Sequence, residues 1–143
     1  EAVRKEWPRD LPLFVRVSAT DWMPGGWDLE QTTELARMLK ATGHVDLLDV
    51  SSGGTDPAQK MVVGPGYQVP FAEAIRRNAG IATGAVGLIR DAQQAETILA
   101  TGQADLIIMG RKLMSDPYWP MQAAKALGFD YPWPKQYLRA NIA

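Results

Sequence analysis

IATGAVGLIRDAQQAETILATGQADLIIMGR, residues 81–111, contains a complete strand–helix–strand unit. The apolar run Ile81–Val86 predicts a strand, and Asp91 can cap a helix that runs to about Ala100. A second apolar run, Ala104–Met109, predicts the next strand. Because a helix separates the two strands, we expect them to lie parallel and to be joined by a right-handed crossover.

The same alternation extends toward the N-terminus, in units of about 25–35 residues, which favours a parallel α/β sheet. Residues 1–7 read as the last turns of a helix with no cap residue before them, so we expect this sequence to be a piece of a longer one. The other expected elements are a buried strand over Leu13–Val17, a strand over Val45–Val50, helices from Asp28 to about Ala41 and from Pro70 to about Asn78, and helical stretches after Gly110 and over residues 117–127. The glycine-rich loop from Ser51 to Val69 is unusually long, which favours a functional loop, and the C-terminal tail is expected to be irregular.

Two architectures fit this alternation: a doubly wound open sheet, and half of an eight-stranded barrel. Each expected strand is followed at its C-terminal end by a polar or glycine-rich loop, which is where barrel enzymes place their active sites. We therefore expect residues 1–143 to form one α/β domain, half of a (β/α)8 TIM barrel (strands five to eight), that a missing N-terminal half completes.

The composition limits the possible functions. With 46% hydrophobic and 22% charged residues in 143, the chain has the profile of a single soluble domain. A formal net charge of -1 gives no support to nucleic-acid binding. The absence of cysteine excludes disulfides, thiolate metal sites and a cysteine nucleophile. We find neither a run long enough to span a bilayer nor a signal-peptide pattern, so the expected compartment is the cytoplasm.

The last two strands end in glycine. One closes with Gly84-Ala-Val-Gly87, which includes Val86, and the other with Met109-Gly110-Arg111. Barrel enzymes often bind a phosphate between the loops after their last two strands, because glycine lets backbone N–H groups approach the anion. Arg111 adds a bidentate donor. The pattern favours a phosphate site over the alternative of two tight turns beside a surface arginine.

Arg16 is the one charged residue in its apolar strand. It is either half of a buried ion pair or a fixed cation that faces a ligand, and its position alone does not decide between them. Ser51-Ser-Gly53-Gly follows the second strand, where small residues allow a flat ligand to approach or simply form a flexible turn. Asp46 and Asp49, three apart on that strand, are expected to form salt bridges or caps rather than a general acid/base pair.

Six segments together resemble the Old Yellow Enzyme family, in particular its branch of small bacterial ene-reductases. They occur in the family's order and spacing across nearly the whole chain. The matching segments are Pro12–Ser18, Val45–Gly53, Pro65–Glu73, Thr83–Ile89, Ala104–Arg111 and Asp116–Pro120.

The resemblance implies an eight-stranded α/β barrel that holds FMN without a covalent bond, with this chain as strands five to eight. NADPH would reduce the flavin, which would pass hydride to the activated C=C bond of an α,β-unsaturated carbonyl compound. Arg16 would then lie near the pyrimidine end of the flavin and stabilise the reduced form. The same resemblance assigns Ser51, Gly53 and Val86 to flavin contacts and Gly87, Gly110 and Arg111 to its phosphate.

Arg139 matches an arginine that in this branch reaches into the active site of a neighbouring subunit, which implies a homo-oligomer. The family's substrate-binding pair and proton-donating tyrosine belong to the first four strands, so no catalytic residue is assigned in this chain. Two alternatives remain open: a non-catalytic half-barrel that binds a phosphate-bearing ligand or self-assembles, and a phosphosugar enzyme that shares only the phosphate site.

Overall fold

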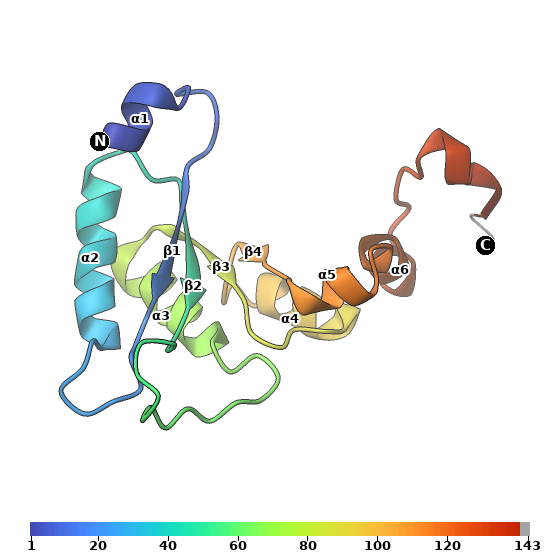
Figure 1. The fold of residues 1–143 in the computed structure, drawn as a ribbon. Helices are drawn as coiled ribbons and strands as arrows, with labels where there is room; N and C mark the ends of the chain where they lie inside the picture. Colours follow the sequence, from blue (N-terminus) through green and yellow to red (C-terminus); the bar gives the residue numbers. More distant parts are fainter. Residues whose placement is uncertain (141–143) are drawn as a thin grey trace.

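The computed structural model describes residues 1–140 and contains a four-stranded sheet with helices between its strands (Figure 1). Every helix and strand expected from the sequence is present, with ends displaced by a few residues. The elements are α1 (Ala2–Glu6), β1 (Phe14–Ser18), α2 (Leu29–Ala41), β2 (Leu47–Ser51), α3 (Val69–Ala79), β3 (Ala82–Ala85), α4 (Ala92–Ala100), β4 (Leu106–Ile107), α5 (Arg111–Ser115), α6 (Trp119–Ala126) and the 3-10 helix η1 (Lys135–Ala140).

All strands pair in parallel, and their order in the sheet is the order in the chain, β1-β2-β3-β4. Each crossover connection therefore leads to the adjacent strand, always in the same direction across the sheet. If the crossovers are right-handed, α2, α3 and α4 all lie on one face of the sheet. Contacts between α2 and α3, and of α3 with β2 and β3, agree with this arrangement. A doubly wound sheet reverses its order at a switch point, which these four strands do not do.

The core lies between this helical layer and one face of the sheet, where Leu48, Val50 and Ile75 are fully buried. On the other face Phe14 is 49% exposed and Leu106 is 42% exposed. The expectation that Leu13–Val17 forms a buried strand is thus wrong for one face of β1, because no described element covers it. Parallel sheets are normally covered on both faces.

The helix ends follow the expected chemistry. Asp28 forms a capping box with Gln31, and the Asp91 carboxylate accepts a hydrogen bond from the Gln94 N–H at 2.7 Å.

Near the C-terminus, Tyr118 and Tyr137 contact each other edge to face. The segment expected to be irregular therefore contains a short helix, η1, that this aromatic pair holds in place. Within residues 1–140, no helix has the length and apolar character needed to cross a membrane.

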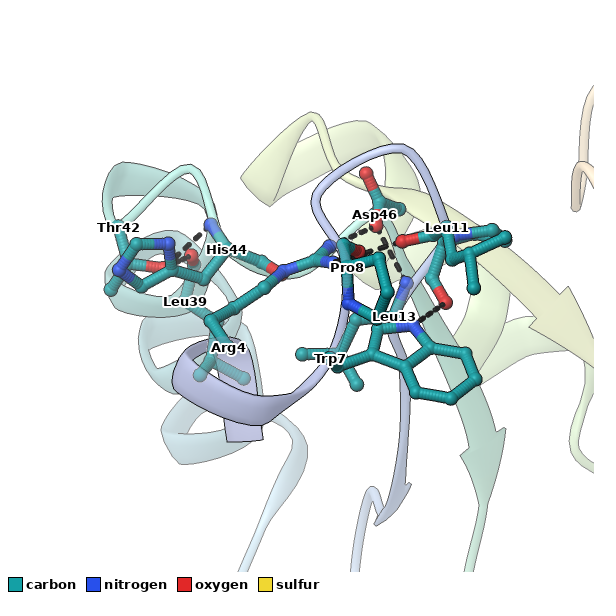
Figure 2. Close-up of polar contacts among 10 residues, drawn as sticks. Arg4, Trp7, Pro8, Leu11, Leu13, Leu39, Thr42, His44 and Asp46 are labelled. Carbon is teal, nitrogen blue, oxygen red and sulfur yellow. Dashed lines mark hydrogen bonds and ion pairs between the residues drawn. The ribbon is translucent and has the colours of Figure 1, made fainter. Parts of the chain in front are cut away.

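At the N-terminal ends of the strands, Arg4 ties α1 to the start of β2 (Figure 2). Its guanidinium donates to the carbonyl oxygens of Pro8, Leu11 and His44 and forms an ion pair with Asp46 at 2.7 Å. The predicted salt-bridge role of Asp46 is confirmed, and the contacts fix the entry into the sheet at the end opposite to the glycine-rich loops.

Candidate functional site

A pocket of about 280 Å³ lies at the C-terminal ends of the strands, where their glycine-rich loops meet. Of the residues proposed from sequence, those that line it are Arg16, Ser51, Val86, Gly87, Gly110 and Arg111. They come from β1, β2 and the loops that follow β3 and β4, so the fold brings together side chains up to 95 positions apart in sequence (111 − 16). Tyr67 and Gln68 also line the pocket.

Gly87 is required where it stands. Its φ of +127° is in the region that favours glycine, and a Cβ atom would meet Gln68 Nε2 at 3.0 Å and the Tyr67 ring at 3.1 Å. The Gly87 carbonyl also accepts a hydrogen bond from the Gly66 N–H at 2.8 Å. A Cβ at Gly110, in contrast, would have no neighbour within 4 Å. One glycine thus serves close packing, while the other leaves space open in the pocket.

The pocket lining is strongly cationic. Its charged residues are Arg16, Arg90, Arg111 and Lys112, and no carboxylate is among them. Lys112 is paired with Asp116 at 3.1 Å, whereas the guanidinium groups of Arg90 and Arg111 have no ion-pair or hydrogen-bond partner within residues 1–140. Two unpaired guanidinium groups beside glycine backbone suit an anion with several acceptor oxygens, such as a phosphate monoester.

Arg16 forms an ion pair and also lines the pocket. Its Nε donates to Asp49 Oδ2 at 2.6 Å, which confirms the predicted salt bridge of Asp49. The Arg16 side chain is nonetheless 58% exposed and lines the pocket, so the pair is not a buried one. Asp49 Oδ1 is buried and has no hydrogen-bond partner among the described residues.

Gln68 was not among the residues expected from the sequence. It is 2% exposed; its Nε2 donates to the Val86 carbonyl at 3.0 Å, and its Oε1 accepts a hydrogen bond from the Ser52 hydroxyl at 2.7 Å. The amide therefore joins the loop after β2 to the loop after β3, behind the Gly87 backbone. Two signals pointed to this region: the unusual length of the loop that begins at Ser51, and the resemblance of the segment Pro65–Glu73 to the family.

Two residues proposed from the sequence lie outside the pocket. Gly53 packs within the loops after β1 and β2, where a Cβ would meet Gln59 Oε1 at 2.6 Å and Trp22 Cδ1 at 3.3 Å. Arg139 lies in η1 and is exposed. Within residues 1–140, no group of three or more His, Cys, Asp or Glu side chains could hold a metal ion.

The clear pKa shifts lie away from the pocket. Asp46 and Asp105, at the N-terminal ends of β2 and β4, have lowered pKa values. The Asp46 carboxylate is stabilised by a hydrogen bond from the Leu13 N–H and by the charge of Arg4. The Asp105 carboxylate is stabilised chiefly by a hydrogen bond from Arg76, with a further one from the Thr83 N–H. A hydrogen bond with Tyr137 raises the pKa of Tyr118. These groups are structural, and the pocket itself presents fixed positive charge.

Solved structures share this fold. A 2-naphthoyl-CoA reductase in complex with 2-naphthoyl-CoA superposes with a TM-score of 0.77 at 26% identity, over 87% of this chain and 19% of that one. Histamine dehydrogenase from Rhizobium sp. 4-9 superposes with a TM-score of 0.62 at 20% identity, over 80% of this chain and 17% of that one, and shows likeness of fold alone.

Curated relatives are closer in sequence. The chain is 53% identical over 139 residues to an NADPH dehydrogenase of Geobacillus thermodenitrificans, covering 97% of this chain and 40% of that protein. It is 53% identical over 140 residues to an NADPH dehydrogenase of Listeria innocua, covering 98% of this chain and again 40% of that protein. The chain thus spans well under half the length of these relatives. The sequence profile of the NADH:flavin oxidoreductase / NADH oxidase family matches residues 1–129, and the chain belongs to that family.

Proposed function

We propose that this chain is the C-terminal half of an FMN-dependent, NADPH-oxidising ene-reductase, and that it supplies the flavin's phosphate site. The observation that carries the proposal is the cationic, glycine-lined pocket at the C-terminal strand ends. The family and the names of the relatives support FMN and NADPH as the cofactors. When bound, FMN would supply hydride transfer from NADPH to the activated C=C bond of an α,β-unsaturated carbonyl compound.

The residues present fit such a cofactor. Gly87 and Gly110 both line the pocket, Gly110 leaves space open there, and the unpaired Arg111 guanidinium matches a phosphate monoester in charge and shape. Arg16, more than half exposed on the open face of the sheet, would place positive charge beside the flavin ring. Ser51 and Val86 would contact the flavin from the ends of β2 and β3. Gly53 is a weaker candidate, because its surroundings are protein side chains.

The open face of the sheet supports a half-barrel. Phe14 and Leu106 are exposed there, and β1 and β4 each have a free edge. A complementary N-terminal half with four more strands would cover both the face and the edges. We assign the proton donor and the substrate-binding pair to that half, and the cross-subunit contact of a homo-oligomer to Arg139.

Reconstitution tests the proposal. This chain should be produced together with the first half of a related NADPH dehydrogenase and purified in the presence of FMN. We expect a yellow complex that oxidises NADPH and reduces cyclohexenone. A colourless complex that binds a sugar phosphate instead would favour the phosphosugar alternative, and a yellow complex without alkene reduction would favour a binding role.

A further inference from the structure

We propose that Asp49 is a positioning residue that aims Arg16 into the pocket, an inference that rests on the proposed function. The two residues are register partners on neighbouring strands, so their side chains leave the sheet on the same face. The single bond between them joins Arg16 Nε to Asp49 Oδ2 at 2.6 Å. Asp49 itself is outside the pocket lining, so it acts on the site through Arg16.

The geometry of the pair is unusual for an arginine and a carboxylate. These groups commonly form two parallel hydrogen bonds that occupy the terminal nitrogens. Here the carboxylate holds Nε only, and neither Nη atom of Arg16 has a partner within residues 1–140. The side of the guanidinium nearest the strand is therefore fixed, and the two terminal NH₂ groups remain free for a ligand in the pocket that Arg16 lines.

Restraint matters here because Arg16 is otherwise free to move. Its side chain is 58% exposed, and an arginine side chain loses rotamer entropy when it is held. Asp49, at 15% exposure, is the more buried partner. A clamp through Nε holds the cation in place before the ligand arrives, so that less ordering remains to be done on binding. The Asp49 charge also offsets part of the positive potential that Arg16 presents.

Two substitutions at Asp49 separate these effects. Asp49→Asn removes the charge but keeps an oxygen that can accept from Nε, whereas Asp49→Val removes both. In the FMN-loaded protein formed with the complementary half, we expect Asp49→Asn to raise the flavin midpoint potential, because more positive charge then faces the reduced flavin. Asp49→Val should give a potential below that of Asp49→Asn, because Arg16 is no longer held. Asp49→Ala replaces Val if that variant does not fold.

Arg16→Met provides the reference for a potentiometric titration. Arg16→Met should lower the midpoint potential. When it is combined with Asp49→Asn or with Asp49→Val, the two double variants should have equal midpoint potentials. If Arg16→Met leaves the potential unchanged, the proposed contact of Arg16 with the flavin is wrong. If Arg16→Met lowers it but Asp49→Asn and Asp49→Val have equal potentials in the presence of Arg16, the proposed function stands and the positioning role of Asp49 is overturned.

Discussion

Arg111 is the residue on which the phosphate assignment depends most directly. It follows Gly110 at the end of β4, lines the pocket, and has no side-chain partner within the described part of the chain. A charged hydrogen bond is worth about 1.5–3 kcal/mol, so Arg111→Ala should raise the dissociation constant for FMN about tenfold or more in the reconstituted protein.

A fluorescence titration with FMN measures this change. Arg37→Ala is the matched control, because Arg37 lies on α2 and pairs with Glu34 instead of lining the pocket. Equal FMN affinity of wild-type protein and a folded Arg111→Ala variant would remove Arg111 from the site.

The two pocket glycines should respond differently to alanine. At Gly87 the added Cβ meets Gln68 and Tyr67 at a positive φ, and such strain costs about 1–3 kcal/mol. Gly87→Ala should therefore lower both thermal stability and FMN affinity. At Gly110 the Cβ enters open space in the pocket, so Gly110→Ala should lower FMN affinity with a smaller loss of stability. Paired melting curves and FMN titrations test this, and a Gly110 variant with wild-type affinity would contradict it.

These residues also show what the sequence could predict about the site. Glycine at two neighbouring strand ends, with arginine directly after one of them, pointed to this edge of the sheet, and the pocket there is lined by Gly87 and Arg111. Gln68 was not predictable, because a glutamine in a loop gives no pattern, and its importance comes from burial between two loops distant in sequence. Gly53 shows the reverse case, because the sequence suggested it for the site but it lies outside the pocket. Its φ of +67° and the absence of a Cβ allow Gln59 and Trp22 to pack closely against it.

At the scale of elements, one structural unit occurs twice. Before β2, the Asp46 N–H donates to the Leu13 carbonyl, the Asp46 carboxylate accepts from the Leu13 N–H, and Arg4 holds the carboxylate. Before β4, Asp105 and Thr83 make the same reciprocal pair, with Arg76 of α3 as the cation.

In both units the arginine also binds a carbonyl of the preceding loop, of His44 in the first and Gly102 in the second. Each unit links the helix before one strand to the start of the next strand. These Arg–Asp units therefore fix the register of β1 with β2 and of β3 with β4 from the end opposite to the pocket.

The Arg–Asp units predict a pH dependence of stability. Because the folded-state pKa values of Asp46 and Asp105 are below their ordinary value of 3.8, their stabilisation is complete above that pH and is lost as the pH falls through the lower folded values. Unfolding in urea, measured from pH 6 down to pH 3, should show stability falling at the acidic end. The double substitution of Asp46 and Asp105 by Asn should reduce that fall. An unchanged slope would mean that these carboxylates are not linked to folding.

The elements themselves were predictable, but not their ends. Hydrophobic runs located all four strands, and the caps Asp28 and Asp91 fixed two helix starts to the residue. β4 is limited to Leu106–Ile107, shorter than the expected Ala104–Met109, because a strand extends only as far as its neighbour pairs with it, and β4 has one neighbour. Apolar composition alone does not carry that information.

At the scale of the whole molecule, Arg139 is proposed to act across a subunit boundary. It lies in η1, whose Tyr137 contacts Tyr118 at the start of α6, and it is outside the pocket. Arg139→Ala should raise the KM for the alkene or weaken the oligomer while FMN content stays near normal. Steady-state kinetics and sedimentation test this, with Lys135→Ala on the same helix as the control. If both measurements match wild type, the cross-subunit role is wrong.

The last prediction concerns the chain on its own. Two features favour association: the open face with Phe14 and Leu106 exposed, and the edges of β1 and β4, which pair with no other strand among the described residues. Burial of apolar surface returns about 25 cal/mol per Å², so covering this face should hold two halves together without a covalent link.

We therefore expect the chain produced alone to aggregate or to dimerise through its edges, and to lack alkene reductase activity even with FMN and NADPH. Addition of the first four strands should convert it to a defined complex. Light scattering after size exclusion gives the mass, and a cyclohexenone assay gives the activity. A monodisperse monomer that reduces cyclohexenone unaided would overturn the half-barrel proposal, and with it the assignment of the proton donor to the complementary half.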